Sequence, residues 1–265
     1  MRPLLLAAAA LALLLAPFAL PPEARAGGDP PQVPCQVLDA VCPDLMVDPF
    51  KLRQNNIVTT TFSATSCSVI EGMVPSAGAH ELLRFTFTTP NLGPGDLAIG
   101  APSAHPEWFV FSPCHNHYHF REYADYRLWT LDGYAQWAAL RAALPTMTAE
   151  EVFALFPELQ AKMVAGHKQG FCVIDLVPAT AGVTTTAGLG NGLSALPRNY
   201  LSCGSDQGIS VGWSDEYFYT LSGQWVVIDT VPAGLYMLEA EVNAERLYHE
   251  HDYSNNAAAT PVQIP

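Results

Sequence analysis

Short runs in which apolar and polar residues alternate are the feature that most limits how this chain can fold. In the clearest run, Leu83, Phe85 and Phe87 alternate with an arginine and two threonines. Similar runs are found at 57–63, 115–131, 170–177, 224–229 and 236–242. Because side chains point alternately to the two faces of a β-strand, this period of two predicts half-buried strands. Many short strands separated by Gly and Pro are typical of a β-sandwich, so we expect a mainly β, sandwich-like single domain with long loops.

One stretch departs from this pattern and predicts helix instead. Residues 134–164 are rich in Ala, Leu, Glu and Gln. Thr148 precedes Glu151 by three residues, the spacing of a capping box that opens a helix. We therefore expect a short helical insertion between two strands rather than a second domain. Residues 179–200, rich in Gly, Thr and Ala, predict a long loop.

The first residues of the chain predict export. Arg2 precedes an apolar, alanine-rich stretch from Leu4 to about Leu20, and the small-x-small sequence of 24–26 follows. These features are typical of a secretory signal peptide, so we expect residues 1–26 to be removed. The alternative is a retained membrane anchor. No later segment is long and apolar enough to span a bilayer, so we expect a secreted protein, extracellular or periplasmic, with no transmembrane segment in the mature chain.

The rest of the chain is long enough for one domain with its own core. We expect 27–41 to be a flexible lead-in and 42–265 to be the folded domain. Loss of two arginines and one glutamate with the signal peptide leaves 10 basic and 24 acidic residues, a formal charge of −14. This charge excludes nucleic acid as a natural partner and favours cationic ligands.

Six cysteines lie beyond the predicted signal peptide, at positions 35, 42, 67, 114, 172 and 203. An even number of cysteines in an exported protein indicates disulfides, although six cysteines allow 15 connectivities. None of them forms a Cys-x-x-Cys pair, so we do not expect a structural zinc knuckle.

The run 114–119, with the sequence CHNHYH, carries the clearest chemistry. His115, His117 and His119 occupy alternate positions, so on a β-strand all three imidazoles would lie on one face. Imidazole suits copper, zinc, iron and nickel, and three protein nitrogens leave a position open for water or substrate. The spacing therefore predicts a metal site. The alternative is a surface histidine cluster that binds metals adventitiously.

Further motifs follow this run in a fixed order. They are GHKQGFC at 166–172, QGISVG at 207–212, DEY at 215–217, QW at 224–225 and DYSNN at 252–256. Together with CHNHYH, they make the chain resemble the catalytic domain of the lysyl oxidases, copper amine oxidases that carry a lysine tyrosylquinone cofactor. The resemblance extends from Cys42 to Asn256, and it implies that 42–265 is a lysyl oxidase-like catalytic domain.

The resemblance implies a role for individual residues. His115, His117 and His119 correspond to the copper ligands. Lys168 corresponds to the lysine whose amine attacks an oxidised tyrosine ring, and Tyr217 corresponds to that tyrosine. Without the resemblance, Lys168 could be an ordinary solvated lysine, and a single tyrosine on a strand is usually part of a core.

The implied activity is the oxidation of primary amines, either peptidyl lysine or small amines. The quinone forms a Schiff base with the cationic substrate's amine, and a base then removes the α-proton. Hydrolysis releases an aldehyde, and O2 reoxidises the cofactor to give hydrogen peroxide and ammonia. Asp215, two residues before Tyr217, is our candidate for that base.

The DYSNN motif offers oxygen ligands of the kind that hard cations accept. In extracellular members of the similar family, a calcium ion ties this segment to an early Asp-Leu pair. The corresponding residues here are Asp44, Leu45, Asp252, Asn255 and Asn256. The alternative is a turn rich in Asp and Asn without an ion.

The resemblance also bears on the disulfides. It implies a Cys114–Cys203 bond that fixes the copper-binding strand to the loop before the QGIS run. Cys35 and Cys42 are close enough in the sequence to pair. Cys67 and Cys172 remain, and they either pair with each other or stay free.

The chain departs from the animal members of the similar family at several points. Trp213 and Gly223 replace two cysteines that flank the quinone tyrosine, and the additional histidine before Cys114 is missing. The insertion at 134–164 replaces a short turn. These departures affect substrate specificity and cofactor rigidity more than copper binding, and they fit a divergent, microbial-type member.

Two other functions are compatible with the motifs. The first is a non-catalytic, secreted copper-binding or matrix-binding module that keeps the histidine ligands and lacks the quinone. The second is a zinc hydrolase with a three-histidine site, although no general base is evident near the histidines. Metal analysis would separate zinc from copper.

Overall fold

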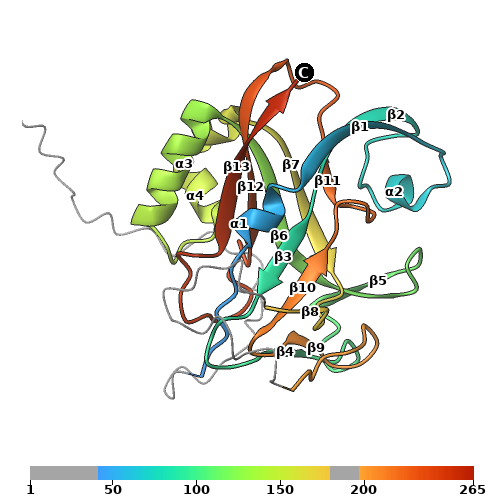
Figure 1. Ribbon diagram of the computed structural model, residues 1–265, viewed down its shortest axis with the longest axis vertical. Helices are drawn as coiled ribbons and strands as arrows, with labels where there is room; N and C mark the ends of the chain where they lie inside the picture. The colour runs from blue at the N-terminus through green and yellow to red at the C-terminus, as the bar shows by residue number, and fades with distance from the viewer. Residues whose placement is uncertain (1–40, 180–196) are drawn as a thin grey trace, which may run out of the picture. The chain divides into compact units, whose positions relative to one another are not determined.

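The computed structural model describes residues 41–179 and 197–265. The predicted signal peptide, the lead-in up to residue 40 and most of the predicted 179–200 loop lie outside the described residues. Strands predominate in the part of the chain that is described, which confirms the predicted mainly β class (Figure 1). None of the helices within these ranges has the length and apolar character that crossing a membrane requires.

The strands are β1 (Asn55–Phe62), β2 (Gly78–Phe85), β3 (Phe87–Pro90), β4 (Leu97–Gly100), β5 (Phe109–Ser112), β6 (His117–Thr130), β7 (Met163–Phe171), β8 (Val177–Pro178), β9 (Gln207–Ile209), β10 (Trp213–Tyr217), β11 (Trp225–Val227), β12 (Gly234–Val242) and β13 (Ala257–Ile264). The helices are α1 (Pro49–Leu52), α2 (Cys67–Ile70), α3 (Leu131–Ala143), α4 (Ala149–Leu155) and the 3-10 helix η2 (Pro157–Lys162).

The largest sheet has five strands and is organised around β6. Its order is β13-β12-β6-β5, and β7 also pairs with β6. Two three-stranded sheets, β1-β2-β11 and β3-β10-β8, and the pair β4-β9 complete the described strands. All of these pairings are antiparallel, as expected for a sandwich built from short strands.

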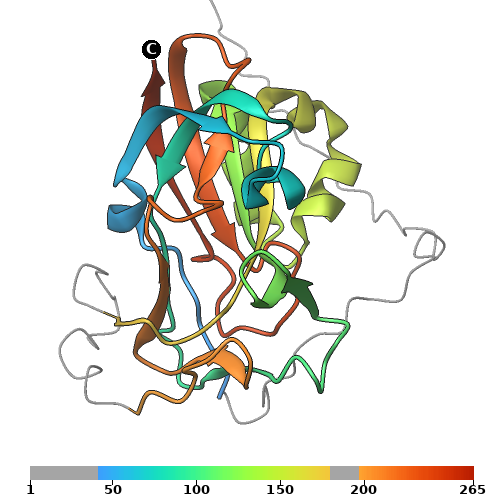
Figure 2. The same ribbon diagram turned by 90° about the vertical axis from the view of Figure 1, so that its right-hand side faces the viewer.

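The two faces of the large sheet contact different parts of the chain. Tyr126 points into the main core, where its ring packs edge-on against Phe85 and Phe87 with centroids 4.7 and 5.3 Å apart. Trp129, an odd-numbered residue of the same strand, packs among the helices on the opposite face. Figure 2 shows β1 and β2 in front of the large sheet. This packing of smaller sheets against a larger one agrees with the expected sandwich-like arrangement.

The run around Leu83 differs from its prediction. It is divided between β2 and β3, and Thr86 and Thr88 are buried together with the apolar residues. Both threonine hydroxyls are satisfied, because Thr86 accepts a hydrogen bond from the Tyr219 backbone and Thr88 donates one to Glu216. The expectation of a half-buried strand is therefore wrong here, since the polar residues Thr86 and Thr88 are as buried as their apolar neighbours.

The helical insertion is present between β6 and β7, as predicted. It begins at Leu131, three residues earlier than expected, because Thr130 at the end of β6 caps α3 by accepting a hydrogen bond from Gly133 N. The capping box at the start of α4 is confirmed, with Thr148 and Glu151 bonding each other's backbone. Figure 1 shows α3 and α4 beside the large sheet.

A buried ionic network lies beneath the insertion. The Arg127 guanidinium donates hydrogen bonds to Glu239 and Glu241 of β12 and to Asp125 of its own strand. Glu239 also accepts from the indole N–H groups of Trp129 and Trp137, both at 2.8 Å. Removing one partner from such a network leaves a buried charge uncompensated and costs about 3–5 kcal/mol. The bond from Trp137 fixes α3 of the insertion to the sheet.

Two disulfides among the described residues differ from the implied pairing. Cys67 bonds Cys114, and Cys172 bonds Cys203, so the expected Cys114–Cys203 bond is wrong. The expectation that Cys67 and Cys172 pair with each other or stay free is wrong for the same reason. Cys203 lies beside the end of β7 because β9 pairs its backbone with Val173. Cys42 is also disulfide-bonded. The expected Cys35–Cys42 pair cannot be followed, since Cys35 lies outside the described residues.

Candidate active site

The β5–β6 hairpin carries all three histidines of the CHNHYH run. His117 and His119 lie on β6, but His115 lies in the turn, so the expectation that all three share one strand is wrong. Asn116 in this turn has a φ of 56°, a left-handed conformation that asparagine tolerates better than most residues. The ligand nitrogens of the three histidines nevertheless lie within 4.8 Å of one another.

The distances between the ring nitrogens fit a shared metal ion. His119 Nε2 lies 3.0 Å from His117 Nε2 and 3.4 Å from His115 Nδ1. Two imidazole nitrogens bound at 2.0–2.1 Å to one tetrahedral ion are separated by about 3.3 Å. The donor set therefore fits a transition metal such as copper or zinc.

Burial keeps two of these imidazoles neutral. Desolvation lowers the pKa of His119 to about 4, with a further contribution from repulsion by His117 and His115. Desolvation also lowers the pKa of His117. At neutral pH both rings are uncharged and keep a lone pair for a metal, so no proton has to be displaced from them when an ion binds.

A cavity of about 300 Å³ is lined by His119 and Lys168, and Glu71 also lies on its wall. Gly170 lies beside the buried His119: a Cβ there would lie 2.9 Å from the Phe120 carbonyl and 3.5 Å from the His119 side chain. No motif around Glu71 indicated a role for it. Its only sequence signal is its position four residues after Cys67, whose disulfide connects it to the histidine run.

Lys168 points toward the helical insertion. It lies opposite Asp125 in the β6–β7 register, and its Nζ forms ion pairs with Glu150 of α4 at 2.8 Å and with Glu245 at 3.0 Å. Desolvation acts to lower the pKa of Lys168, but the two carboxylates outweigh it and raise the pKa above its usual value. In this arrangement the amine is a protonated cation and not a nucleophile.

Tyr217 packs against the main core instead. Its ring packs against Phe171 with centroids 3.9 Å apart, and its hydroxyl donates a hydrogen bond to the Cys172 carbonyl at 2.5 Å. Burial raises the pKa of Tyr217 well above the usual value, and the nearby Asp215 carboxyl raises it further. The phenol is therefore neutral at physiological pH.

Lys168 and Tyr217 lie on opposite sides of the large sheet. Side chains alternate along β7, so Lys168 leaves the face opposite to that of Phe171, against which Tyr217 packs. Gly170 shares the face of Lys168, and its closest side-chain neighbour is His119. The structure thus brings Lys168 and His119 to one cavity, which Tyr217 does not line.

Asp215, the predicted base, is fully buried on β10. Burial raises the pKa of its carboxyl well above the usual value, and the nearby Tyr217 side chain only partly opposes this effect. Neither carboxylate oxygen has a hydrogen-bond partner within the described residues. This shift favours the protonated carboxyl, the form that acts as an acid rather than a base. Its predicted role remains a prediction.

The residues of the predicted calcium site also lie together. Asn255 donates a hydrogen bond to Asp44 at 2.9 Å, and the Leu45 backbone N–H donates to Glu250 at 2.7 Å. Desolvation raises the pKa of Asp44, and nearby Asp252 contributes to the same rise. The DYSNN segment is thus joined to the early Asp-Leu pair.

Glu250 is a member of this cluster that the sequence reasoning missed. It lies two residues before Asp252 in a segment without regular secondary structure, so no local pattern indicated it. Burial raises the pKa of Glu250 to about 8. Its Oε1 accepts hydrogen bonds from Asn243 and Asn256, while the buried Oδ1 atoms of Asn255 and Asn256 have no hydrogen-bond partner within the described residues. Several carbonyl-type and carboxylate oxygens with unused lone pairs fit a hard cation such as calcium.

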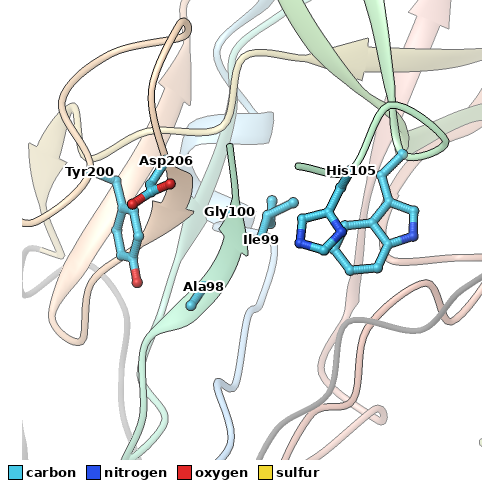
Figure 3. Close-up of a pocket in the computed structure, with 7 residues that line it drawn as sticks. Ala98, Ile99, Gly100, His105, Tyr200 and Asp206 are labelled. Carbon is cyan, nitrogen blue, oxygen red and sulfur yellow. The ribbon is translucent and has the colours of Figure 1, made fainter. Parts of the chain in front are cut away.

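A second cavity, of about 350 Å³, lies beside β4 and away from the histidine cluster. Figure 3 shows Tyr200 and Asp206 on one side of β4 and His105 on the other. The His105 ring stacks on Trp108 with centroids 4.0 Å apart. None of the predicted site residues lines this cavity, so the cavity next to His119 is the candidate substrate site.

Known proteins match most of this chain. The lysyl oxidase family model matches residues 133–264. The protein-lysine 6-oxidase of Rattus norvegicus is 26% identical over 231 residues, which are 83% of this chain and 46% of that protein. Lysyl oxidase homolog 2 of Homo sapiens is 29% identical over 185 residues, which are 69% of this chain and 18% of that protein.

The fold and the site define a mainly β protein with a candidate three-histidine metal centre. The chain belongs to the lysyl oxidase family. It spans about half the length of the rat protein and 43% of the Gallus gallus protein-lysine 6-oxidase that it also matches.

Proposed function

We propose that this chain is a secreted, copper-dependent amine oxidase that converts primary amines to aldehydes. The observation that carries the proposal is the convergence of His115, His117 and His119 beside a cavity that also contains Lys168, in a member of the lysyl oxidase family. The proposed reaction consumes the amine, O2 and water, and it yields the aldehyde, ammonia and hydrogen peroxide. The two electrons removed from the amine carbon reduce O2.

The three imidazoles would hold the copper ion, which would supply redox chemistry with O2. The cavity wall supplies a negative field, because Glu71 lines it and Glu150 and Glu245 surround Lys168 at its other end. A cationic amine, either a peptidyl lysine or a small amine, suits such a field. The disulfides support secretion, since such bonds persist in oxidising compartments.

The cofactor of the proposed enzyme is a lysine tyrosylquinone formed from Lys168 and Tyr217. Two changes have to precede the cross-link. Lys168 must leave Glu150 and Glu245 and lose its proton, and Tyr217 must leave the Cys172 carbonyl and turn out of the core. Asp215 would then be less buried beside the displaced ring, which would lower its pKa toward that of a base.

A calcium ion held by Asp44, Glu250 and Asn255 would tie the segment before β13 to the start of the domain. The unpaired buried oxygens of Asn255 and Asn256 support this proposal. Metal analysis of the purified chain and of a Glu250→Gln variant tests it. Calcium in the parent and a loss in the variant are expected, and a calcium-free parent would contradict the proposal.

A second candidate function is a non-catalytic copper-binding module. The specific observation in its favour is that Lys168 and Tyr217 are each fully engaged with other partners on opposite faces of β7. Such a module would bind copper with the same three histidines and would form no cofactor.

The deciding experiment is an assay of hydrogen peroxide release by copper-loaded protein with lysine-containing peptides and small diamines. We expect release that phenylhydrazine inhibits and that is lost in a Tyr217→Phe variant, which keeps the ring and removes only the hydroxyl. Copper bound at one ion per chain without any peroxide release would favour the non-catalytic module. A chain that binds zinc and excludes copper would contradict both.

A further inference from the structure

We propose that Glu71 is a positioning residue of the metal centre, which orients His115 by accepting a hydrogen bond from its Nε2–H. This inference rests on the proposed copper site and adds to it a residue outside the histidine run. Glu71 follows α2, far in the sequence from the hairpin that carries the ligands.

The two nitrogens of His115 face different groups. Its Nδ1 lies 3.4 Å from His119 Nε2 and so points into the cluster of ligand atoms. Its Nε2 points the other way and lies 4.0 Å from Glu71 Oε2. This distance is just beyond a hydrogen bond, so a small rotation of either side chain would join the two atoms.

Glu71 is held in place by more than one contact. Ser112 Oγ, at the end of β5, donates a hydrogen bond to Glu71 Oε1 and accepts one from the backbone N–H of His115 at 3.1 Å. The Cys67–Cys114 disulfide joins α2 to the residue directly before His115. Serine and disulfide together fix the glutamate against the turn that carries the histidine.

The second carboxylate oxygen is left free for His115. Glu71 Oε2 is buried and has no hydrogen-bond partner within the described residues. A buried acceptor without a partner is unfavourable, and the Nε2–H of His115, 4.0 Å away, can satisfy it after a small rotation. The geometry therefore leaves one unused acceptor facing one unused donor.

Such a bond has a defined effect on a metal ligand. A carboxylate that accepts the proton of one imidazole nitrogen selects the tautomer with a lone pair on the other nitrogen and fixes the orientation of the ring. In His115 this would place the lone pair on Nδ1, the atom that faces His119. Because His115 lies in a turn and not on β6, it needs this support more than the two strand histidines do.

The test compares copper binding by the full chain and by Glu71→Ala and Glu71→Gln variants, with Glu107→Gln as a matched control. Glu107 is exposed and pairs with His105 beside the second cavity. Copper(II) affinity is measured by competition with a chelator, the copper(II) environment by electron paramagnetic resonance, and folding by the Tm of the metal-free protein. We expect Glu71→Ala to weaken copper binding by about 10- to 100-fold and to change the spectrum.

Glu71→Gln should keep most of the affinity, because its amide oxygen can accept the same hydrogen bond, and Glu107→Gln should match the parent. Copper affinity of Glu71→Ala within about twofold of the parent, with an unchanged spectrum, would overturn the inference. Equal losses in Glu71→Ala and Glu71→Gln would also overturn it, since they would indicate an effect of charge or folding alone. A parent that binds copper without oxidising amines would refute the proposed enzyme and leave the role of Glu71 standing.

Discussion

The three imidazoles of the β5–β6 hairpin converge in the fold, whereas Lys168 and Tyr217 leave opposite faces of β7. The first group is local, since five consecutive positions and one turn bring the nitrogens together. The second group depends on two distant segments, and each residue has stable partners of its own. The three histidines are therefore already placed to bind a metal ion, whereas Lys168 and Tyr217 must move before they can form a cofactor. Copper binding and cofactor formation should therefore be separable steps.

The largest effect is expected from removing a metal ligand from the β5–β6 hairpin. His119→Ala removes the most buried of the three ligands, the one whose Nε2 lies close to both other histidines. We expect the copper affinity to fall by more than about 100-fold, a larger loss than that from a supporting residue. Competition with a chelator measures it. Lys168→Arg serves as the control, because it should leave copper affinity within about twofold of the parent. Similar losses in both variants would mean that the two groups are not separable.

A second prediction concerns the neutral imidazoles of the metal-free hairpin. The pKa of His119 is about 4 in the folded chain and 6.5 in the unfolded chain. As the pH falls below 6.5, the unfolded chain binds the proton first, so stability decreases until the pH reaches about 4 and then stays level. The free energy of unfolding should fall by roughly 3 kcal/mol over this window because of His119.

Urea unfolding of the metal-free protein at several pH values measures this effect. A His119→Asn variant provides the reference, since other buried groups titrate equally in both proteins. The pH-dependent difference between the two proteins should appear between pH 6.5 and 4. A constant difference over that window would show that the imidazole is not held neutral by the fold.

The smallest effect is expected from weakening an ion pair that holds Lys168. Glu150→Gln weakens one of the two ion pairs that hold Lys168, and Glu158→Gln on η2 is its matched control. The amine should lose its proton and leave the pair more readily, so carbonyl labelling should appear about threefold to tenfold faster after copper is added. Glu150 is exposed, so stability should change by less than about 1 kcal/mol. Labelling at the parent rate or slower would show that this ion pair does not restrain Lys168.

The sequence predicted the features that depend on neighbouring residues. The period of two identified β1, β2, β6, β11 and β12, whereas the predicted 170–177 run lies mostly between β7 and β8 and β4, β9, β10 and β13 had no predicted run. Thr148 and Glu151 marked the start of α4, and the spacing of the histidines predicted that they would converge. The separation of Lys168 from Tyr217 could not be predicted, because it depends on which face of β7 each residue occupies or packs against.

The remaining features depend on contacts between distant segments. The Cys67–Cys114 pairing follows from the packing of α2 against the hairpin, which no local pattern encodes. Glu71 reaches the histidines for the same reason, and Glu250 is identified only by its bonds to Asn243, Asn256 and Leu45. Thr86 and Thr88 have the polarity of an exposed face, but both are buried and bond Tyr219 and Glu216, which are distant in the sequence.

The most direct test of the central claim is peptide mapping of copper-loaded protein after reaction with phenylhydrazine in air. We predict one labelled species in which the peptide containing Lys168 is covalently joined to the peptide containing Tyr217, and no such species without copper. Recovery of the two peptides separately and unmodified, from protein that has bound one copper per chain, would contradict the proposal that Lys168 and Tyr217 form the cofactor. The histidine hairpin would then be a copper site without a cofactor.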